Sequence, residues 1–172
     1  MPQKKDTGKS KLDGNIVLKT ENITKVYPGT IALQNVDFNV HYGKVNALVG
    51  ENGAGKSTLM KVIAGIEQPS SGKIIYKDVE NVLKSPIAAS KKGIGIIHQE
   101  LNLFPHLNVA ENIFMTRELR KGWIDHKTQE EKTKELMKRL SHDINPKTLV
   151  SNLRIGQQQI VEIAKALSQD IE

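Results

Sequence analysis

Short apolar segments in the first half of the chain have the pattern of β-strands. Residues 32–40 alternate cleanly between apolar and polar positions, and residues 16–20 and 73–76 are shorter segments of strand character. Pro28-Gly29 stands between the first two segments and marks a turn. The pattern therefore predicts strands joined by short connections.

Two further segments are almost wholly apolar, which is typical of strands buried on both faces. They are residues 45–49 and 94–97, and we expect both to be buried strands. Residues 68–72, where Gln, Pro, Ser and Gly cluster, are predicted to form a loop.

Apolar spacing and capping residues predict helices, mostly in the second half of the chain. They are expected over residues 57–63, from Ser85-Pro86 to Gly93, from Asn108 (with Glu111 completing a capping box) to Ile113, and over 127–140 and 157–167. The order along the chain is thus a β-rich start, a β–loop–α unit and a mostly helical part.

A glycine-rich loop lies between the segment 45–49 and the helix predicted over 57–63. It fits the phosphate-binding motif G-x-x-x-x-G-K-[ST], with the residues Gly50, Glu51, Asn52, Gly53, Ala54, Gly55, Lys56, Ser57 and Thr58. The three glycines permit positive φ and a close approach, so that backbone amides and the helix N-terminus form an anion nest. Lys56 supplies charge for the β- and γ-phosphates, and the Ser57 hydroxyl is a ligand for Mg²⁺. The motif predicts nucleotide binding without distinguishing ATP from GTP.

The composition is ordinary for a soluble globular protein, with 38% hydrophobic and 26% charged residues among 172. No apolar run approaches the length of a membrane span and no signal-peptide pattern is present, so a cytosolic setting is expected. The absence of cysteine excludes disulfides and thiolate metal sites, and none of the five histidines shows metal-ligand spacing.

The net charge is +6, and residues 1–14 are rich in lysine. We expect these residues to form a disordered basic tail. Nucleic-acid binding is not expected, because no aromatic residues are interleaved with the lysines to stack bases.

Hydrolysis of a bound nucleotide requires a second carboxylate that holds Mg²⁺ through water, usually at the end of an apolar strand. No apolar strand after residue 57 ends in Asp or Glu. The sequence therefore looks incomplete at its C-terminal end. For the chain alone we expect weak nucleotide binding, little or no turnover, exposed apolar surface and poor solubility.

Three further runs stand out, over residues 23–29, 97–113 and 153–167. They resemble motifs of the ATP-binding cassette (ABC) subunits of bacterial sugar importers, in the subgroup that serves ribose, galactose and xylose. Together with the phosphate loop they follow the order of the family's motifs, and the resemblance covers almost the whole chain after the tail. It implies the N-terminal part of the first nucleotide-binding domain, truncated.

The resemblance implies roles for matching positions. Tyr27 would stack on the adenine ring, although an ordinary tyrosine at a strand end also fits this position. Gln99 would bind Mg²⁺ and sense the attacking water, making it catalytic together with Lys56; a polar loop residue is the plainer alternative. The signature motif would aim a helix N-terminus at the γ-phosphate of ATP on an opposing domain. Its residues are Leu153, Arg154, Ile155, Gly156 and Gln157.

The signature motif departs from the family's commonest pattern, because Arg154 and Ile155 stand where that pattern has Ser and Gly. An arginine here either reaches the phosphate through a charge-assisted bond or points away and weakens the site. We hypothesise that Gly156 still docks on the partner's ATP while Arg154 alters the rate.

The expected fold is α/β: an ABC-type P-loop NTPase core with an antiparallel β lobe and a helical lobe, incomplete at the C-terminus. Residues 15–172 would form a partial ABC nucleotide-binding domain whose helical lobe covers roughly 101–167. The implied function is to couple ATP binding and hydrolysis, with Mg²⁺, to sugar import at the cytoplasmic face of the membrane, as a peripheral subunit. The implied partners are membrane permease subunits, a periplasmic or extracellular sugar-binding protein and a second nucleotide-binding domain. A soluble non-transport ABC ATPase and a non-catalytic nucleotide-binding fragment are the alternatives.

Overall fold

The computed structural model describes residues 15–81 and 83–169. The chain divides into two compact units, Met1–Ala89 and Ser90–Glu172, and each is described by itself. The tail predicted over residues 1–14 lies outside the described residues.

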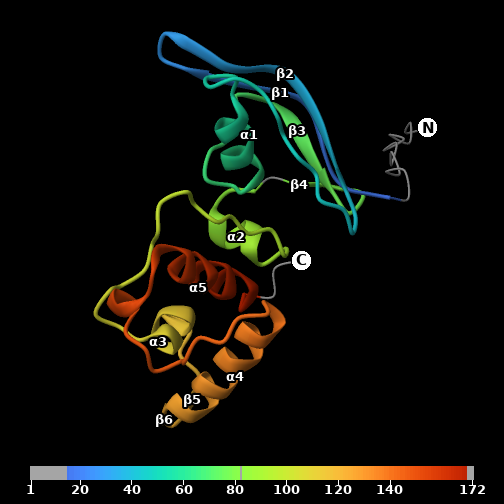
Figure 1. Cartoon of the computed structure of the whole chain (residues 1–172). Helices are drawn as coiled ribbons and strands as arrows, with labels where there is room; N and C mark the ends of the chain where they lie inside the picture. Colours follow the sequence, from blue (N-terminus) through green and yellow to red (C-terminus); the bar gives the residue numbers. More distant parts are fainter. Residues whose placement is uncertain (1–14, 82, 170–172) are drawn as a thin grey trace, which may run out of the picture. The chain divides into compact units, whose positions relative to one another are not determined.

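A four-stranded sheet dominates the first unit, with strand order β2-β1-β3-β4 and antiparallel pairing between neighbours (Figure 1). The strands are β1 (Ile16–Tyr27), β2 (Thr30–His41), β3 (Ser71–Tyr76) and β4 (Val79–Asn81). Pro28-Gly29 forms the turn between β1 and β2, where Gly29 has a φ of 77°. The antiparallel β lobe and the strand segments 16–20, 32–40 and 73–76 are confirmed. Strand β3 begins at Ser71, inside the segment predicted as a loop.

Helix α1 (Lys56–Ile63) lies beside this sheet (Figure 1) and supplies part of the first unit's core. Leu59 and Val62 of α1 are almost fully buried, as are Leu33 of β2 and Ile74 of β3. The helix predicted over residues 57–63 is thus confirmed, and its apolar face is the one turned away from solvent.

Helix α2 (Pro86–Ser90) begins where the sequence predicts. The Ala88 amide donates to the Ser85 hydroxyl oxygen at 3.2 Å, so Ser85 caps the helix. Gly93, with a φ of 84°, lies in the turn that follows.

Three helices form the core of the second unit. They are α3 (Val109–Phe114), α4 (His126–Arg139) and α5 (Ile155–Leu167), joined by a 3-10 turn η1 (Val150–Asn152) and a small hairpin of β5 (Arg120–Lys121) and β6 (Trp123–Ile124). Their fully buried apolar side chains include Val109, Ile113, Met137, Val161 and Ala164. The predicted helices over 127–140 and 157–167 are confirmed within one or two residues. The sequence reasoning did not predict the hairpin.

The capping box at the start of α3 is also confirmed. The Glu111 amide donates to Asn108 Oδ1 at 2.9 Å, and the Asn108 amide donates to Glu111 Oε2 at 2.8 Å. Both contacts lie within four residues of sequence, which is why the sequence alone predicts them.

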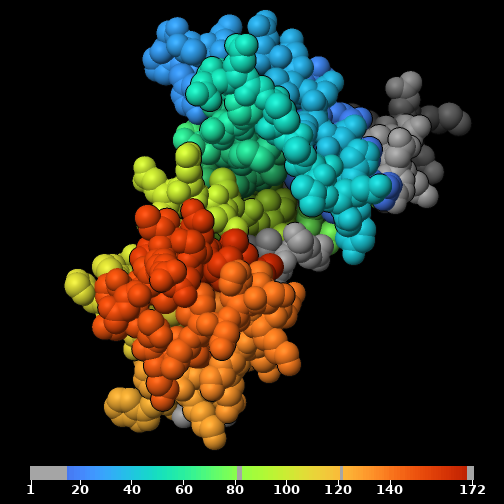
Figure 2. All heavy atoms as spheres, in the orientation of Figure 1, coloured from blue at the N-terminus to red at the C-terminus, as the bar shows by residue number. Residues whose placement is uncertain are grey.

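The two segments predicted as buried strands, 45–49 and 94–97, are not strands in this structure. Val45 and Val49 are 100% and 89% exposed and Ile97 is 50% exposed; Figure 2 shows the former segment, in cyan, at the surface of the first unit. A strand exists only with a neighbour to take its backbone hydrogen bonds, and neither segment pairs with another strand in the part of the chain that the structure describes. The predicted exposed apolar surface is present at these residues.

Candidate functional site

The glycine-rich loop ends in a tight turn that leads directly into α1. Gly53 and Gly55 have φ values of 88° and 83°, in the region that favours glycine. The Ala54 amide donates to the Glu51 carbonyl at 3.2 Å, and the Leu59 amide donates to the Gly55 carbonyl at 2.9 Å. The predicted positive φ is therefore present at Gly53 and Gly55.

The prediction of a positive φ at Gly50 was wrong. Gly50 is absent from the positive-φ glycines, and a Cβ there would meet Ala54 Cβ at 3.5 Å, an ordinary contact. The turn that needs left-handed backbone is confined to the second half of the loop.

Gly55 is also required by the close approach of the sheet. A Cβ at this position would lie 2.5 Å from the Ala32 carbonyl oxygen and 2.7 Å from Leu33 Cδ2. Both residues belong to β2, so the loop is seated against the sheet and no other residue type fits without displacing the backbone.

Lys56 folds back over the loop. Its Nζ donates to the carbonyl oxygens of Gly50 and Glu51, each at 2.6 Å. The Lys56 ammonium thus lies over the loop that leads into the N-terminus of α1, and we call the loop, this ammonium group and the helix N-terminus the phosphate cradle. A positive charge beside a helix N-terminus favours the binding of a phosphate chain. Ser57, the next residue, is exposed and presents a hydroxyl of the type that ligates Mg²⁺.

Tyr27 is half-buried at the end of β1, in the same unit as the phosphate loop. The Lys25 ammonium lies 5.0 Å from the centre of its ring, in a cation–π contact. Lys25 also pairs with Glu67 at 3.0 Å. The hydrogen bond from Lys25 is the main reason that the pKa of Glu67 lies below the ordinary value for glutamate, and the Tyr27 hydroxyl contributes in the same direction.

Gln99 lies in the second unit, exposed and outside regular secondary structure. The segment after it is held by α5: the Asn102 amide donates to Glu162 Oε1 at 2.7 Å, and the Asn102 carbonyl accepts from Lys165 Nζ at 3.0 Å. Both backbone groups of one residue are thus bound by charged side chains of the signature helix. The role predicted for Gln99 stays a prediction.

The signature residues form the start of α5. The Arg154 amide donates to Gln157 Oε1 at 3.0 Å, which is half of a capping box because an arginine side chain has no acceptor to return the bond. Ile155 is 71% exposed, and a Cβ on Gly156 would meet nothing within 4 Å. Leu153 is partly buried against the core. The helix N-terminus is therefore open to a ligand or partner in this unit, and the Arg154 side chain is exposed beside it.

Two polar side chains that the sequence analysis did not assign hold this region together. Gln158 Nε2 donates to the carbonyls of Val150 and Leu153, at 3.2 and 3.0 Å, and so fixes the turn before α5. Asn112, on α3, is fully buried and binds the loop of residues 104–108. An asparagine in an apolar helix is the only sequence signal for the second of these, and it does not reveal the partners.

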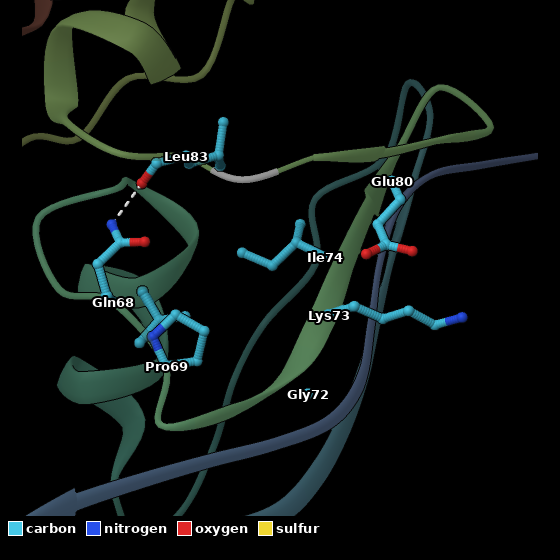
Figure 3. Close-up of a pocket in the computed structure, with 8 residues that line it drawn as sticks. Gln68, Pro69, Gly72, Lys73, Ile74, Glu80 and Leu83 are labelled. Carbon is cyan, nitrogen blue, oxygen red and sulfur yellow. Dashed lines mark hydrogen bonds between the residues drawn. The ribbon is translucent and has the colours of Figure 1, made fainter.

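A pocket with a volume of about 190 Å³ lies between α1 and the β3–β4 pair (Figure 3). It is lined by Val62, Gln68, Pro69, Gly72, Lys73, Ile74, Glu80 and Leu83. Gln68 Nε2 donates to the Leu83 carbonyl at 2.6 Å across it, while the Lys73 ammonium points away from Gln68 and Pro69. Since it contains no residue of the phosphate loop, it is a packing gap of the first unit, separate from the candidate site.

Comparison with known proteins identifies the family of the chain. Residues 33–172 match the family described as ABC transporter. The chain belongs to the ABC transporter family. Proteins of this family bind nucleotide, which agrees with the phosphate cradle. Within the described ranges 15–81 and 83–169, none of the helices has the length and apolar character needed to cross a bilayer.

This ABC chain is similar to curated import proteins. It is 51% identical over 164 residues to a ribose/galactose/methyl galactoside import ATP-binding protein of Agrobacterium fabrum, covering 95% of this chain and 32% of that protein. It is 50% identical over 156 residues to the corresponding protein of Burkholderia lata, covering 90% and 30%. The chain therefore spans about a third of the length of these relatives.

Solved ABC structures share its fold. A nucleotide-free ATP-binding cassette from an ABC transporter has a TM-score of 0.77 at 28% identity, over 91% of this chain and 66% of that one. A dimeric cassette in a post-hydrolysis state, bound to ADP and Pi, has a TM-score of 0.71 at 27% identity, over 89% and 70%. The predicted fold class, an α/β ABC-type core, is thereby confirmed.

Proposed function

We propose that this chain is part of an ATP-binding subunit that couples ATP binding and hydrolysis to sugar import through a membrane permease. The phosphate cradle carries the proposal: Lys56 Nζ lies 2.6 Å from two loop carbonyls, and Gly55 is pressed against β2. The likeness to ribose/galactose/methyl galactoside import ATP-binding proteins supports a sugar as the transported substrate.

The first unit would bind the nucleotide. The loop amides and the N-terminus of α1 receive phosphate oxygens, and Lys56 exchanges its two carbonyl partners for phosphate, whose charge it neutralises. Ser57 offers its hydroxyl to Mg²⁺, which would supply electrostatic stabilisation of the phosphoryl group. Tyr27 stacks on the base.

The second unit would supply Gln99 and the signature helix α5. Gln99 senses Mg²⁺ and the attacking water, and the open N-terminus of α5 faces the γ-phosphate held by a second nucleotide-binding domain. The dimeric ABC cassette among the similar structures supports this pairing. Membrane permease subunits and a periplasmic or extracellular sugar-binding protein would be the further partners, with the subunit peripheral at the cytoplasmic face of the membrane.

Replacement of Lys56 by alanine tests the nucleotide site. Because hydrogen bonds to charged groups contribute about 1.5–3 kcal/mol each, Lys56→Ala should weaken ATP binding about tenfold to a hundredfold in equilibrium titration. Lys61→Ala, at an exposed position of the same helix, is the matched control and should leave the affinity unchanged. An equal affinity for Lys56→Ala and the parent chain would refute the proposal.

For the transport role, the full-length protein should co-purify with membrane permease subunits; recovery with ribosomes would favour a non-transport ABC ATPase.

A further inference from the structure

Lys25 is an unusually constrained lysine. Its side chain is only 14% exposed, and its Nζ donates to the Gln68 carbonyl at 2.7 Å and pairs with Glu67 Oε2 at 3.0 Å. The same ammonium lies 5.0 Å from the centre of the Tyr27 ring. Lysines are seldom buried unless they are paired, and this one is held from two sides while its charge covers one face of an aromatic ring.

The contact fixes the orientation of the Tyr27 ring. Lys25 and Tyr27 are two residues apart on β1 and therefore project to the same side of the strand. A ring has two faces, and with the ammonium over one of them the other is the face available to a flat base. A ring that is already oriented loses less conformational freedom on binding, and base–aromatic stacking contributes about 1–3 kcal/mol.

The strand geometry connects this ring to the phosphate loop. Lys25 is the register partner of Leu33, whereas Val26 pairs with Ile31, so Ala32 is an extra residue that forms a bulge in β2. Ala32 and Leu33 are the residues that touch the Cβ position of Gly55. The strand segment bearing Lys25 is thus one strand away from the cradle.

Lys25 also bonds to the segment that follows the C-terminal end of α1. Its partners Glu67 and Gln68 follow that helix, while Gly55 precedes it. A single side chain on β1 is therefore bonded to the segment leaving the phosphate-loop helix and packed against the ring at the strand end.

We propose that Lys25 is a positioning residue for nucleotide binding: bound by Glu67 and Gln68, it holds the Tyr27 ring in the orientation that receives a purine base beside the phosphate loop. The inference rests on the proposed nucleotide binding. It assigns recognition of the base, as distinct from recognition of the phosphates, to the Lys25–Tyr27 pair.

Comparison of two ligands isolates this role. ATP carries a base and inorganic tripolyphosphate does not, so the ratio of their affinities for the 172-residue chain, measured by titration calorimetry with Mg²⁺, reports base binding. Lys25→Met keeps the aliphatic stem and removes the ammonium; we expect ATP affinity to fall about threefold to tenfold, with tripolyphosphate affinity unchanged. Tyr27→Leu should lower the same ratio. The double variant should lose less ATP-binding free energy than the sum of the losses in the two single variants, because the two residues act through one contact.

Two further variants control for charge. Lys19→Met removes an ion-paired lysine from the same strand, paired with Glu21 at 2.8 Å, and should leave both affinities unchanged. Lys25→Arg, which keeps a cation over the ring, should restore most of the ATP affinity.

The outcomes separate this inference from the proposed function. Equal losses of ATP and tripolyphosphate affinity in Lys25→Met would show that Lys25 only supports the fold and would overturn the inference. Loss in Tyr27→Leu with none in Lys25→Met would overturn it as well. In both cases a Lys56-dependent affinity for ATP would leave the proposed function intact. Absence of any ATP binding by the parent chain would overturn both.

Discussion

Replacement of Asn112 by alanine should loosen the loop that precedes α3. The Asn112 Oδ1 accepts from the Phe104 amide at 2.7 Å. Its Nδ2 donates to the carbonyls of Phe104, Leu107 and Asn108 at 3.0, 3.2 and 3.0 Å. The side chain is fully buried. It therefore satisfies backbone groups of the loop of residues 104–108 that would otherwise need water as a hydrogen-bond partner.

The magnitude follows from the number of contacts. The Asn112 Nδ2 has two hydrogens for three carbonyls, so the four contacts count as about three full hydrogen bonds. At about 1 ± 0.5 kcal/mol each, these bonds contribute about 2–4 kcal/mol. The effect should extend beyond the loop. The Val150 amide donates to the Leu107 carbonyl at 3.1 Å and the Ser151 amide to the Pro105 carbonyl at 3.0 Å, so the turn before α5 depends on the same loop.

Hydrogen exchange of the chain in its native state is the appropriate assay, because it reports each segment separately. Amides of residues 104–109 and 150–153 should exchange about 30-fold to 700-fold faster in Asn112→Ala, the equivalent of about 2–4 kcal/mol. Asn112→Asp keeps the acceptor for the Phe104 amide but places a carboxylate against three carbonyl oxygens, so at neutral pH it should be at least as unstable. Asn152→Ala, at an exposed position, is the control. Exchange in Asn112→Ala within twofold of the parent chain would refute the reasoning.

Two other perturbations test the first unit. Gly55→Ala adds a Cβ 2.5 Å from a backbone oxygen of β2 and should lower the free energy of unfolding, measured in urea, by about 2–4 kcal/mol. Gly53 has a similar φ but open space around its Cβ position, so Gly53→Ala should lower it by about 1 kcal/mol. Equal losses in the two variants would show that the close approach to β2 is not what makes Gly55 necessary. The pKa of Glu21 lies below its ordinary value of 4.5 because Lys19 and Lys73 donate to it, so its contribution to stability is present above pH 4.5 and is lost as the pH falls through the lowered pKa. Glu21→Gln should therefore flatten the acid side of the stability profile, and an unchanged acid slope would contradict the assignment.

Features encoded within a few residues were predictable from the sequence. The capping box of Asn108 and Glu111, the turn at Pro28-Gly29 and the phosphate loop each depend on residue types at short spacing, and the structure has the first two as expected. Within the loop, a positive φ was predicted at three glycines and the prediction failed at Gly50, because a motif gives residue identities without saying which glycines carry the positive φ.

Features that depend on distant partners were not predictable. Residues 45–49 and 94–97 have the composition of strands, but a strand forms only when a second strand takes its backbone hydrogen bonds. The composition of a segment does not show whether that second strand is present. Asn112 and Lys25 raise the same difficulty in another form. Each is a polar residue whose importance comes from groups it meets only in the fold, and nothing in the local sequence separates Lys25 from the exposed lysines around it.

In the second unit, a loop is tied to a helix by charged side chains as well as by apolar packing, since Leu103 is partly buried against the helical core. Glu162 and Lys165 lie three residues apart on α5, hence on one face, and together they bind the amide and the carbonyl of Asn102. Charge-assisted hydrogen bonds are roughly twice as strong as neutral ones. A displacement of the segment that follows Gln99 must therefore either break both of these bonds or carry α5 with it. Because both bonds are exposed, breaking them costs only the difference between the bonds and the hydration of the two freed side chains, so they bias the loop toward moving together with α5 without enforcing it.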